Sequence, residues 1–554
     1  MENRDTDKVG DWGLTEIAAF ELDAPDDEQL LQQPQRASAG TPSEQQPGAS
    51  PARANAQAVE SPNACKIYVL DATEVAKAHG LPACDPNEVV VDSKTQIPLL
   101  RDHAHDFWHE VSLAPLPHYI SANSAPWYTV EALKHSAALV RDPADADVVL
   151  VNDYCYKLRW LAYVHAGGWL PSLQTSNDEA SAGETLLSIY KHVMAGPLWQ
   201  RRNGSDFTFF QSHTGFARGA VGGEYESMLC QEFAPALQFV NVRAQRYKCQ
   251  DYDEINFLIV PGSVHYADMV KYKVAERRKR LQRGLPAHVP PEEMRPTLLF
   301  FRGKCTPLKY DWKNNADNLG KLMRFHIVQD IAAAQPEDVT AFCTGDRPEM
   351  EAAAAELNGT APMSPETLHG DQMGAFAHSV FCLMISGDSQ TSRRLPEALL
   401  GGCIPVFVGP PFHTLPLAEY IDYAGFSVFF NVTRPTWANA SQIAWTLDMA
   451  KRASHPTDSQ FWVPDIPNIQ DIVIPIERAA DMIGHLRSMP ADEKARRQAA
   501  LRIARSKFFY MPLPHSRGPT GAQVLLQHMC RRAGRDPPAA AAPVQRSLQP
   551  KSSL

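Results

Sequence analysis

The sequence contains no long hydrophobic run among its 554 residues. A helix needs about 20 consecutive apolar residues to span a membrane, and the longest candidate, ALLGGCIPVFVGPPF, is too short and is interrupted by glycine and proline. The start, MENRDTDKVGDWGLTEIAAFELD, also has no basic segment followed by an apolar segment, which is the pattern of a signal peptide. We therefore expect neither a signal peptide nor a membrane anchor in this chain.

Basic residues are not in excess, since 53 Lys and Arg stand against 63 Asp and Glu for a net charge of −10. A nucleic-acid-binding face is basic, so we expect no nucleic-acid partner. Ten cysteines are present, but none belongs to a Cys-X-X-Cys pair or to a Cys/His cluster with metal-ligand spacing. The sequence thus predicts no zinc site, and it leaves disulfide pairing open.

A dinucleotide-binding fingerprint is missing as well. The first strand-like segment and the residues after it, KIYVLDATEVAKAHG, contain one glycine, whereas the G-X-G-X-X-G motif needs three. A nucleotide-dependent reductase is therefore disfavoured. Four Asn-X-Ser/Thr triplets are present, and each is either a glycosylation acceptor in a secretory lumen or a chance occurrence; they begin at Asn203, Asn358, Asn431 and Asn439.

Apolar runs alternate with helix-like stretches through the middle of the chain. KIYVLDA, DADVVLVN, TLLFFRG and SVFCLMIS are typical of buried strands, and YTVEALKHSAALV is typical of an amphipathic helix. This alternation predicts an α/β protein with parallel sheets. Asp145 and Asp147, an Asp-X-Asp pair, are interpreted as a turn before a strand rather than as a metal site.

The polar and proline-rich segments divide the chain into domains. We expect disordered tails at 1–62 and 531–554, because neither can bury enough apolar surface to offset the entropy of ordering. Prolines and a solvated basic helix face predict a linker at 271–295. The linker would separate an N-terminal domain, 63–270, from a C-terminal domain, 296–480, which a helical segment at 481–530 follows.

Candidate ligand-binding side chains are concentrated in the segment SGDSQTSRRLPEALLGGCIPVFVG, residues 386–409. It follows a predicted strand, and Pro396 must lie in the first turn of the next helix, which ends near Gly401 and Gly402. Such a loop binds anions through free backbone N–H groups at the helix start. Arg393 and Arg394 add charge, and either can bind a phosphate in a bidentate manner.

Glu397 lies one turn into this predicted helix and has two interpretations. Its carboxylate could accept hydrogen bonds from sugar hydroxyls. It could equally pair with an arginine while Ser389, Thr391 and Ser392 only cap the helix.

The same segment resembles the core motif of the exostosin-type glycosyltransferases. FCLMISGDSQTSRRLPEALLGGCIPV follows the family pattern closely and departs from it at Ile385 and Pro396. TLLFFRGKC, LPLAEYIDYAGFSVFFN and DPADADVVLVNDYCY are also similar to family segments, so the resemblance extends over about residues 64–480. It implies a GT-B fold, which is two Rossmann-like domains facing a cleft, with a nucleotide sugar on the C-terminal domain.

The resemblance also implies the residues of the donor site. The phosphates would lie against Arg302, Gly303, Arg393 and Arg394, and the ribose against Glu397. The loop residues that complete the phosphate side would be Ser386, Gly387, Asp388, Ser389, Thr391 and Ser392. No metal or other cofactor is required, and the expected donor is a UDP-sugar.

On the acceptor side, the segment PLWQRRNGSDFTFFQSHTGFARG resembles a family segment and retains Asp206 and His213 as candidates for the catalytic base. Two family residues differ here, a histidine that is Phe207 and an aspartate that is Thr214. His213 is favoured because the usual pKa of histidine, near ~6.5, suits proton acceptance at neutral pH. The alternative is a core histidine bonded to backbone.

The resemblance implies an inverting glycosyltransferase that acts on a polysaccharide or a glycoprotein glycan. The alternative is a related protein that has lost its base and binds a nucleotide sugar or glycan, or supports an active transferase in a hetero-complex. Family members are Golgi proteins, although this chain offers no anchor for that location.

Overall fold

The computed structural model describes the chain from Ala64 to Asp536 with gaps. The described ranges are 64–85, 89–91, 98–100, 125–134, 136–159, 177–211, 228, 232–240, 256–259, 281, 284, 295–305, 317–334, 337–344, 348, 351, 355, 372–385, 394–409, 415–437, 471–510 and 519–536. All of them except Ala64 belong to one compact unit, Cys65–Pro543. The expected tail at 1–62 and most of the expected linker at 271–295 lie outside the described residues.

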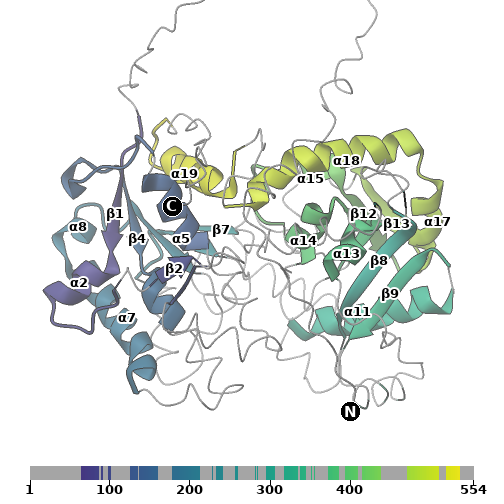
Figure 1. The fold of residues 1–554 in the computed structure, drawn as a ribbon, viewed down its shortest axis with the longest axis horizontal. Coiled ribbons are helices and arrows are strands. Elements are labelled where there is room, and N and C mark those ends of the chain that lie inside the picture. Colours follow the sequence, from purple (N-terminus) through teal and green to yellow (C-terminus); the bar gives the residue numbers. More distant parts are fainter. Residues whose placement is uncertain are drawn as a thin grey trace, which may run out of the picture. The chain divides into compact units, whose positions relative to one another are not determined.

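The first sheet is parallel throughout, with the strand order β1-β4-β5-β6-β7. Figure 1 labels β1, β4 and β7 of this sheet. Its strands are β1 (Ile67–Asp71), β4 (Val148–Asn152), β5 (Phe207–Gln211), β6 (Leu237–Val240) and β7 (Asn256–Ile259). A short antiparallel pair joins β2 (Val89–Val91) to β3 (Pro98–Leu100). The helices of this part are α2 (Ala72–Ala78), α5 (Ala125–Lys134), η4 (Pro143–Asp145), α7 (Asn177–Ala195) and α8 (Pro197–Gln200).

The second sheet is also parallel, with the strand order β13-β12-β11-β10-β8-β9. Its strands are β8 (Thr297–Lys304), β9 (Val339–Thr344), β10 (Ser379–Met384), β11 (Ile404–Gly409), β12 (Val428–Val432) and β13 (Val473–Ile476). Helices α11 (Asp317–Ala333), α13 (Gln372–Ala377), α14 (Arg394–Gly401) and α15 (Tyr423–Phe426) alternate with them. The predicted α/β class with parallel sheets is confirmed.

The chain then continues in helices: α17 (Asp481–Ser488), α18 (Ala491–Arg505), η11 (Ser506–Phe508) and α19 (Gly521–Arg532). Helix α19 begins with a capping box between Thr520 and Gln523 and extends past residue 531. The backbone of Asp536 then accepts a hydrogen bond from the Cys65 N–H. Of the expected tail, 531–554, the structure describes residues 531–536, which lie at the end of α19 and directly after it.

Helix α14 has the ends that the sequence predicts. Pro396 lies in its first turn, and Gly402 follows its last residue with φ +71°, a conformation that glycine adopts without steric cost. The Gly402 N–H donates to the Leu399 carbonyl and the Cys403 N–H donates to the Ala398 carbonyl, the paired hydrogen bonds of a Schellman motif. The chain therefore turns sharply from α14 into β11.

Helix α5 ends earlier than its sequence pattern predicts. The pattern runs on to Val140, but the helix stops at Lys134. Leu139 instead forms a parallel bridge with Ile67, and the Ile67 N–H donates to the Ala138 carbonyl. Pairing with β1 thus outweighs local helix propensity in these residues.

All eight described cysteines form disulfides, which answers a question that the sequence left open. The pairs are Cys65–Cys530, Cys84–Cys155, Cys305–Cys343 and Cys382–Cys403. Disulfides persist in oxidising compartments. The described part of the chain is therefore suited to a secretory or extracellular environment.

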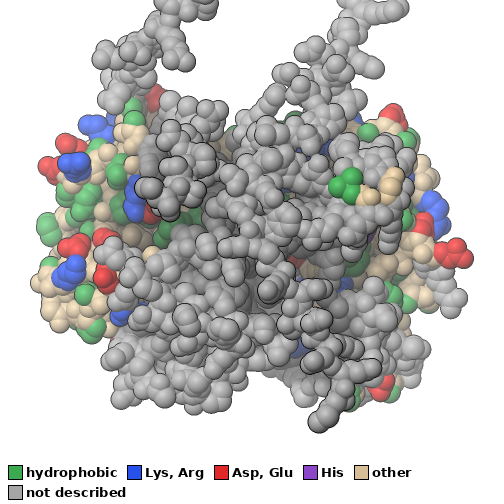
Figure 2. Space-filling model, in the orientation of Figure 1, with side chains coloured by type: hydrophobic (Ala, Val, Ile, Leu, Met, Phe, Trp, Pro, Cys, Tyr) green, Lys and Arg blue, Asp and Glu red, His purple; other side chains and the backbone are tan. Residues whose placement is uncertain are grey.

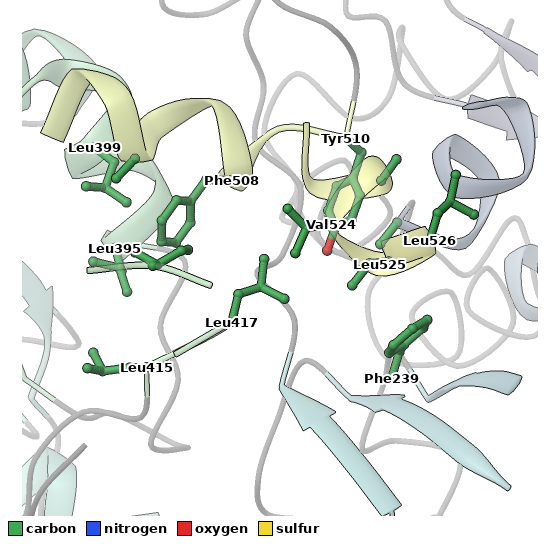
Figure 3. Packing of buried hydrophobic residues seen from close by; sticks show 14 of the residues in the cluster. Phe239, Leu395, Leu399, Leu415, Leu417, Phe508, Tyr510, Val524, Leu525 and Leu526 are labelled. Carbon is green, nitrogen blue, oxygen red and sulfur yellow. The ribbon is translucent and has the colours of Figure 1, made fainter. Parts of the chain in front are cut away.

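One hydrophobic cluster links helices and a strand that are far apart in sequence. It contains Phe239 of β6, Leu395 of α14 and Leu525 of α19, all at most 2% exposed. Figure 3 shows Leu417, Phe508 and Val524 in the same cluster. Two further clusters lie around the first and second sheets. No helix among the described residues is long and apolar enough to cross a membrane.

Candidate functional site

The topology of the second sheet marks a place for a ligand. From β8 the chain moves through α11 to the neighbouring edge strand β9, and from β10 it moves through α14 to β11 on the other side. The winding direction therefore reverses between β8 and β10. In open α/β sheets, ligands bind outside the carboxyl ends of the strands at such a switch point. The predicted phosphate residues come from these two strand ends.

Arg394, the first residue of α14, reaches back to the end of β8. Its Nε donates to the Arg302 carbonyl at 2.7 Å, and its guanidinium lies 5.3 Å from the centre of the Phe301 ring. A Cβ atom on Gly303 would lie 2.6 Å from Arg394 Nη2. Glycine at this position thus lets the guanidinium lie directly on the strand. The structure brings together three of the predicted donor residues, Arg302, Gly303 and Arg394.

Glu397 lies in the same helix and is half-buried. Its Oε2 accepts a hydrogen bond of 2.9 Å from Gln372 Nε2 on α13. Gln372 was not predicted, because a contact between side chains 25 residues apart leaves no pattern in the sequence. The glutamine holds one face of the carboxylate in a fixed direction.

Arg324 is a second residue that sequence reasoning missed. It lies on α11, is 5% exposed, and lies 6.0 Å from the centre of the Phe301 ring. Its Nη2 donates to the Ile385 carbonyl at 3.0 Å and its Nη1 to the Lys304 carbonyl at 3.1 Å. These carbonyls lie at the carboxyl ends of β10 and β8. One buried guanidinium therefore ties together both strands of the switch point.

The remaining predicted residues of the loop, and the favoured base, lie outside the described residues. They are Ser386, Gly387, Asp388, Ser389, Thr391, Ser392, Arg393 and His213. The described elements fix only their flanks: the loop lies between β10 and α14, and His213 follows the carboxyl end of β5 in sequence. Their roles stay predictions.

Asp206 lies at the amino ends of the strands of the first sheet, just before β5 begins. Its Oδ2 lies 2.6 Å from Arg201 Nη2 and 4.0 Å from Arg202 Nε, and its side chain is 2% exposed. Ligands bind at the carboxyl ends of parallel strands, not at the amino ends. This geometry favours a structural ion pair for Asp206 over the predicted role as base.

Phe207 also has a structural explanation. It is 1% exposed and packs against Trp199, with the ring centres 4.9 Å apart. The position is part of the core at the amino end of β5. An aromatic residue here therefore fills the core and does not remove a group from the carboxyl edge. Thr214 lies outside the described residues.

The carboxyl edge of the first sheet carries a buried ion pair that was not predicted. Asp153 follows β4 directly, and its Oδ2 lies 2.7 Å from Lys157 Nζ, both side chains being at most 1% exposed. Tyr190 donates to the same carboxylate, and Lys157 donates to the Phe210 carbonyl of β5. Burial lowers the pKa of Lys157, and Asp153 opposes that shift. The network fixes the ends of β4 and β5.

The Asp-X-Asp pair forms a turn before β4, as predicted. Asp145 ends the short helix η4, and Asp147 is 7% exposed. Asp147 Oδ1 accepts from Arg535 Nε at 2.8 Å, and its Oδ2 accepts from the Lys66 N–H at 3.0 Å. Both carboxylate oxygens of Asp147 thus serve the packing of the C-terminal residues against β1.

Charged side chains of both signs lie interspersed on the described surface shown in Figure 2. Several of them form pairs within one helix, such as Lys77 with Glu74 and Arg496 with Glu493. Pairs of this kind contribute little to stability.

Comparison with known proteins gives an extended match to a family and two short matches to curated proteins. The exostosin GT47 domain matches residues 61–441, which is more than half of the 554 residues but ends before residue 480, where we expected the resemblance to stop. "Probable xyloglucan galactosyltransferase GT12" of Arabidopsis thaliana is 44% identical over 59 residues, 10% of this chain and 12% of that protein.

"Probable xyloglucan galactosyltransferase GT17" of the same plant is 30% identical over 115 residues, 18% of this chain and 25% of that protein. The chain therefore spans at most a quarter of the length of these curated relatives. A solved structure, "Crystal structure of GtfA/B complex", is 13% identical and covers 58% of this chain and 61% of its own, with a TM-score of 0.21. So low a score adds nothing to the description of the fold.

The domain match covers β1 to β12, and it includes the switch point between β8 and β10 with Arg302, Gly303 and Arg394. The motif that resembles this family in the sequence is therefore the segment that supplies the candidate site in the structure. The chain belongs to the exostosin GT47 family.

Proposed function

We propose that the protein is an inverting glycosyltransferase that moves a sugar from a nucleotide sugar, with UDP as the expected nucleotide, to a polysaccharide or glycoprotein glycan. The observation that supports this most is the convergence of Arg302, Gly303 and Arg394 at the switch point of the second sheet. Family membership supports the reaction class, and the relatives' names suggest a galactosyl donor.

In this proposal the diphosphate lies outside the carboxyl ends of β8 and β10. Arg394 contributes a charge fixed by the Arg302 carbonyl and the Phe301 ring, and the loop at 386–393 contributes hydroxyl and backbone N–H groups. These groups would stabilise the negative charge that develops on the departing diphosphate, so no bound metal is required. Glu397, oriented by Gln372, would accept from the ribose hydroxyls.

The acceptor would lie over the first sheet, across a cleft between the two sheets. His213 is the proposed base that takes the proton from the acceptor hydroxyl as the anomeric carbon is attacked. His213→Ala should then lower kcat by about 10² to 10⁴ while donor affinity is retained. A variant that transfers sugar at the wild-type rate would remove His213 from the mechanism.

The test begins with binding. Titration of UDP and a panel of nucleotide sugars, followed by thermal unfolding, should raise Tm in proportion to the logarithm of ligand excess. Arg394→Ala should weaken UDP binding by about 1.5–3 kcal/mol, the range for a charge-assisted hydrogen bond. The matched control is Arg487→Ala, which removes an exposed guanidinium paired with Asp338 at the amino edge of the same sheet.

Three results would count against the proposal. Equal UDP affinity in the wild type and Arg394→Ala would place the anion elsewhere. Strict loss of UDP binding in a chelator, restored by manganese, would mean that the diphosphate is bound through a metal ion. A folded wild type that binds UDP but transfers no sugar to any acceptor would favour the alternative, a binding protein that supports another glycosyltransferase in a hetero-complex.

The proposed location is the Golgi lumen, as in the exostosin family. The four disulfides support it, because a reducing cytosol would not maintain them.

A further inference from the structure

A tight turn between α8 and β5 carries one of the four Asn-X-Ser/Thr triplets, Asn203-Gly204-Ser205. The Ser205 N–H donates to the Arg202 carbonyl at 3.1 Å, which closes a four-residue turn. Both central residues have positive φ, 49° at Asn203 and 73° at Gly204. This is the signature of a type I′ turn, for which Asn-Gly is a preferred pair.

The turn is held against the core from one side. Gly204 is buried, and a Cβ atom there would lie 2.2 Å from the Trp199 ring. Its N–H donates to the Trp199 carbonyl at 3.0 Å. Asn203 and Ser205 flank this anchor and are both exposed. The asparagine side chain is therefore presented to solvent by an ordered piece of backbone.

The other described triplet has a different environment. Asn431 lies in β12, an interior strand that pairs with β11 on one side and β13 on the other, and it is half-buried. Asn358 and Asn439 lie outside the described residues. Among the described triplets, Asn203 is the one whose asparagine lies on an exposed turn.

The disulfides provide an independent second observation. Four cysteine pairs among the described residues indicate an oxidising compartment, and N-glycosylation takes place in the same secretory compartments. We propose that Asn203 is an N-glycosylation site of this protein. The site lies at the amino edge of the first sheet, so a glycan there would project away from the carboxyl edges that carry the candidate chemistry.

The modification is a group transfer from a lipid diphosphate-linked oligosaccharide. A bond forms between Asn203 Nδ2 and C1 of the first sugar, while the bond from C1 to the diphosphate oxygen breaks. The amide gives up one proton, and the lipid diphosphate leaves with the electron pair of the broken bond. The Ser205 hydroxyl completes the acceptor triplet.

A turn-forming role alone would also explain Asn203 and Ser205, because asparagine tolerates positive φ and Ser205 Oγ donates to the Arg202 carbonyl at 2.8 Å. Three variants of the full chain separate the two explanations. Asn203→Asp keeps a residue that suits the turn but removes the acceptor amide. Ser205→Ala removes the triplet, and Ser205→Thr keeps both the triplet and the hydroxyl.

Each variant and the wild type are secreted from a eukaryotic host with an added leader and digested to peptides. Release of glycans by an amidase in heavy-oxygen water converts each occupied asparagine to a labelled aspartate. We expect the label at Asn203 in the wild type and in Ser205→Thr, and its loss in Ser205→Ala. Asn203→Asp and Ser205→Ala should migrate faster in electrophoresis than the wild type, by a shift that corresponds to the mass of one glycan.

An unlabelled Asn203 in secreted wild-type protein would overturn the proposal, whether or not another asparagine carries the label. The result does not depend on glycosyltransferase activity, so it stands apart from the proposed function. Thermal unfolding of enzymatically deglycosylated wild type and Asn203→Asp should give the same Tm, since both then carry aspartate in the turn. A lower Tm in the variant alone would mean that the wild type still carries asparagine at position 203, which would count against the proposal.

Discussion

At the scale of single residues, Gly303 controls where a positive charge lies. In Gly303→Ala the new methyl group would lie 2.6 Å from Arg394 Nη2 and 2.9 Å from Phe301 Cζ. The guanidinium is the flexible end of a side chain and should move away, whereas the buried Phe301 ring must also shift slightly, at some cost in stability. We therefore expect UDP affinity to fall by roughly tenfold, about 1.4 kcal/mol, when it is measured by calorimetry.

The chain offers a matched control for this substitution. Gly484 is an exposed glycine inside α17, and a Cβ atom added there would have nothing within 4 Å. Gly484→Ala should raise the free energy of unfolding by up to about 1 kcal/mol, because alanine is the better helix former, and should leave UDP affinity unchanged. Wild-type affinity in Gly303→Ala would mean that the position of Arg394 over β8 does not matter for the ligand.

At the scale of elements, two arginines bind backbone carbonyls at opposite ends of the strands of the second sheet, one at the carboxyl ends and one at the amino ends. Arg324 joins the carboxyl ends of β8 and β10 through the Lys304 and Ile385 carbonyls. Arg295, just before β8, donates instead to the carbonyls of Phe376, Ser379 and Gly401. Both guanidiniums serve the backbone, but only Arg324 does so beside the candidate donor site.

The corresponding lysine variants separate support of the fold from support of the site. An ammonium group cannot reach all of the carbonyls that each guanidinium spans, so Arg324→Lys and Arg295→Lys should each lower the free energy of unfolding by about 1–3 kcal/mol. Arg324→Lys should in addition weaken UDP binding by roughly tenfold, about 1.4 kcal/mol, with Arg295→Lys near the wild-type value. Equal affinities in the two folded variants would give Arg324 a structural role only.

The elements also show what a sequence pattern can predict. The strands β8 and β10 were predicted because each is a continuous apolar run, and the end of α14 because a glycine there can adopt the positive φ that the turn requires. These signals are local. Arg324 and its partner Ile385 are 61 residues apart, so no local pattern reports their contact. The end of helix α5 was not predicted correctly for the same reason, because it is set by pairing with β1, which is distant in sequence.

At the scale of the whole molecule, α19 carries a histidine that responds to pH. His528 Nδ1 is hydrogen-bonded to Tyr420 OH at 2.8 Å, and its ring lies 6.3 Å from that of Phe239. Burial, with Arg532 and Arg531 nearby, lowers the pKa of His528 to about 4. The Glu419 carboxylate, at 4.0 Å, is 58% exposed and so opposes this only weakly.

The unfolded chain therefore binds a proton at His528 below pH ~6.5, while the folded chain does not until about pH 4. Stability should be lost as the pH falls through this window, by up to roughly 3 kcal/mol. Urea unfolding of wild type and His528→Gln at about pH 7 and about pH 4.5 measures the difference. The variant should lose less stability than the wild type, and parallel losses would mean that the folded histidine accepts the proton.

The bond between Cys65 and Cys530 joins residues 465 positions apart. Ribosomes add about 5–20 residues per second, so Cys530 is synthesised roughly 20–90 s after Cys65. During that time both sheets are made while the thiol beside β1 waits for its partner. The correct bond can close only after α19 has left the ribosome. A chain that terminates early would therefore keep an unpaired thiol beside its first strand, and that thiol would distinguish an incomplete product from a finished one.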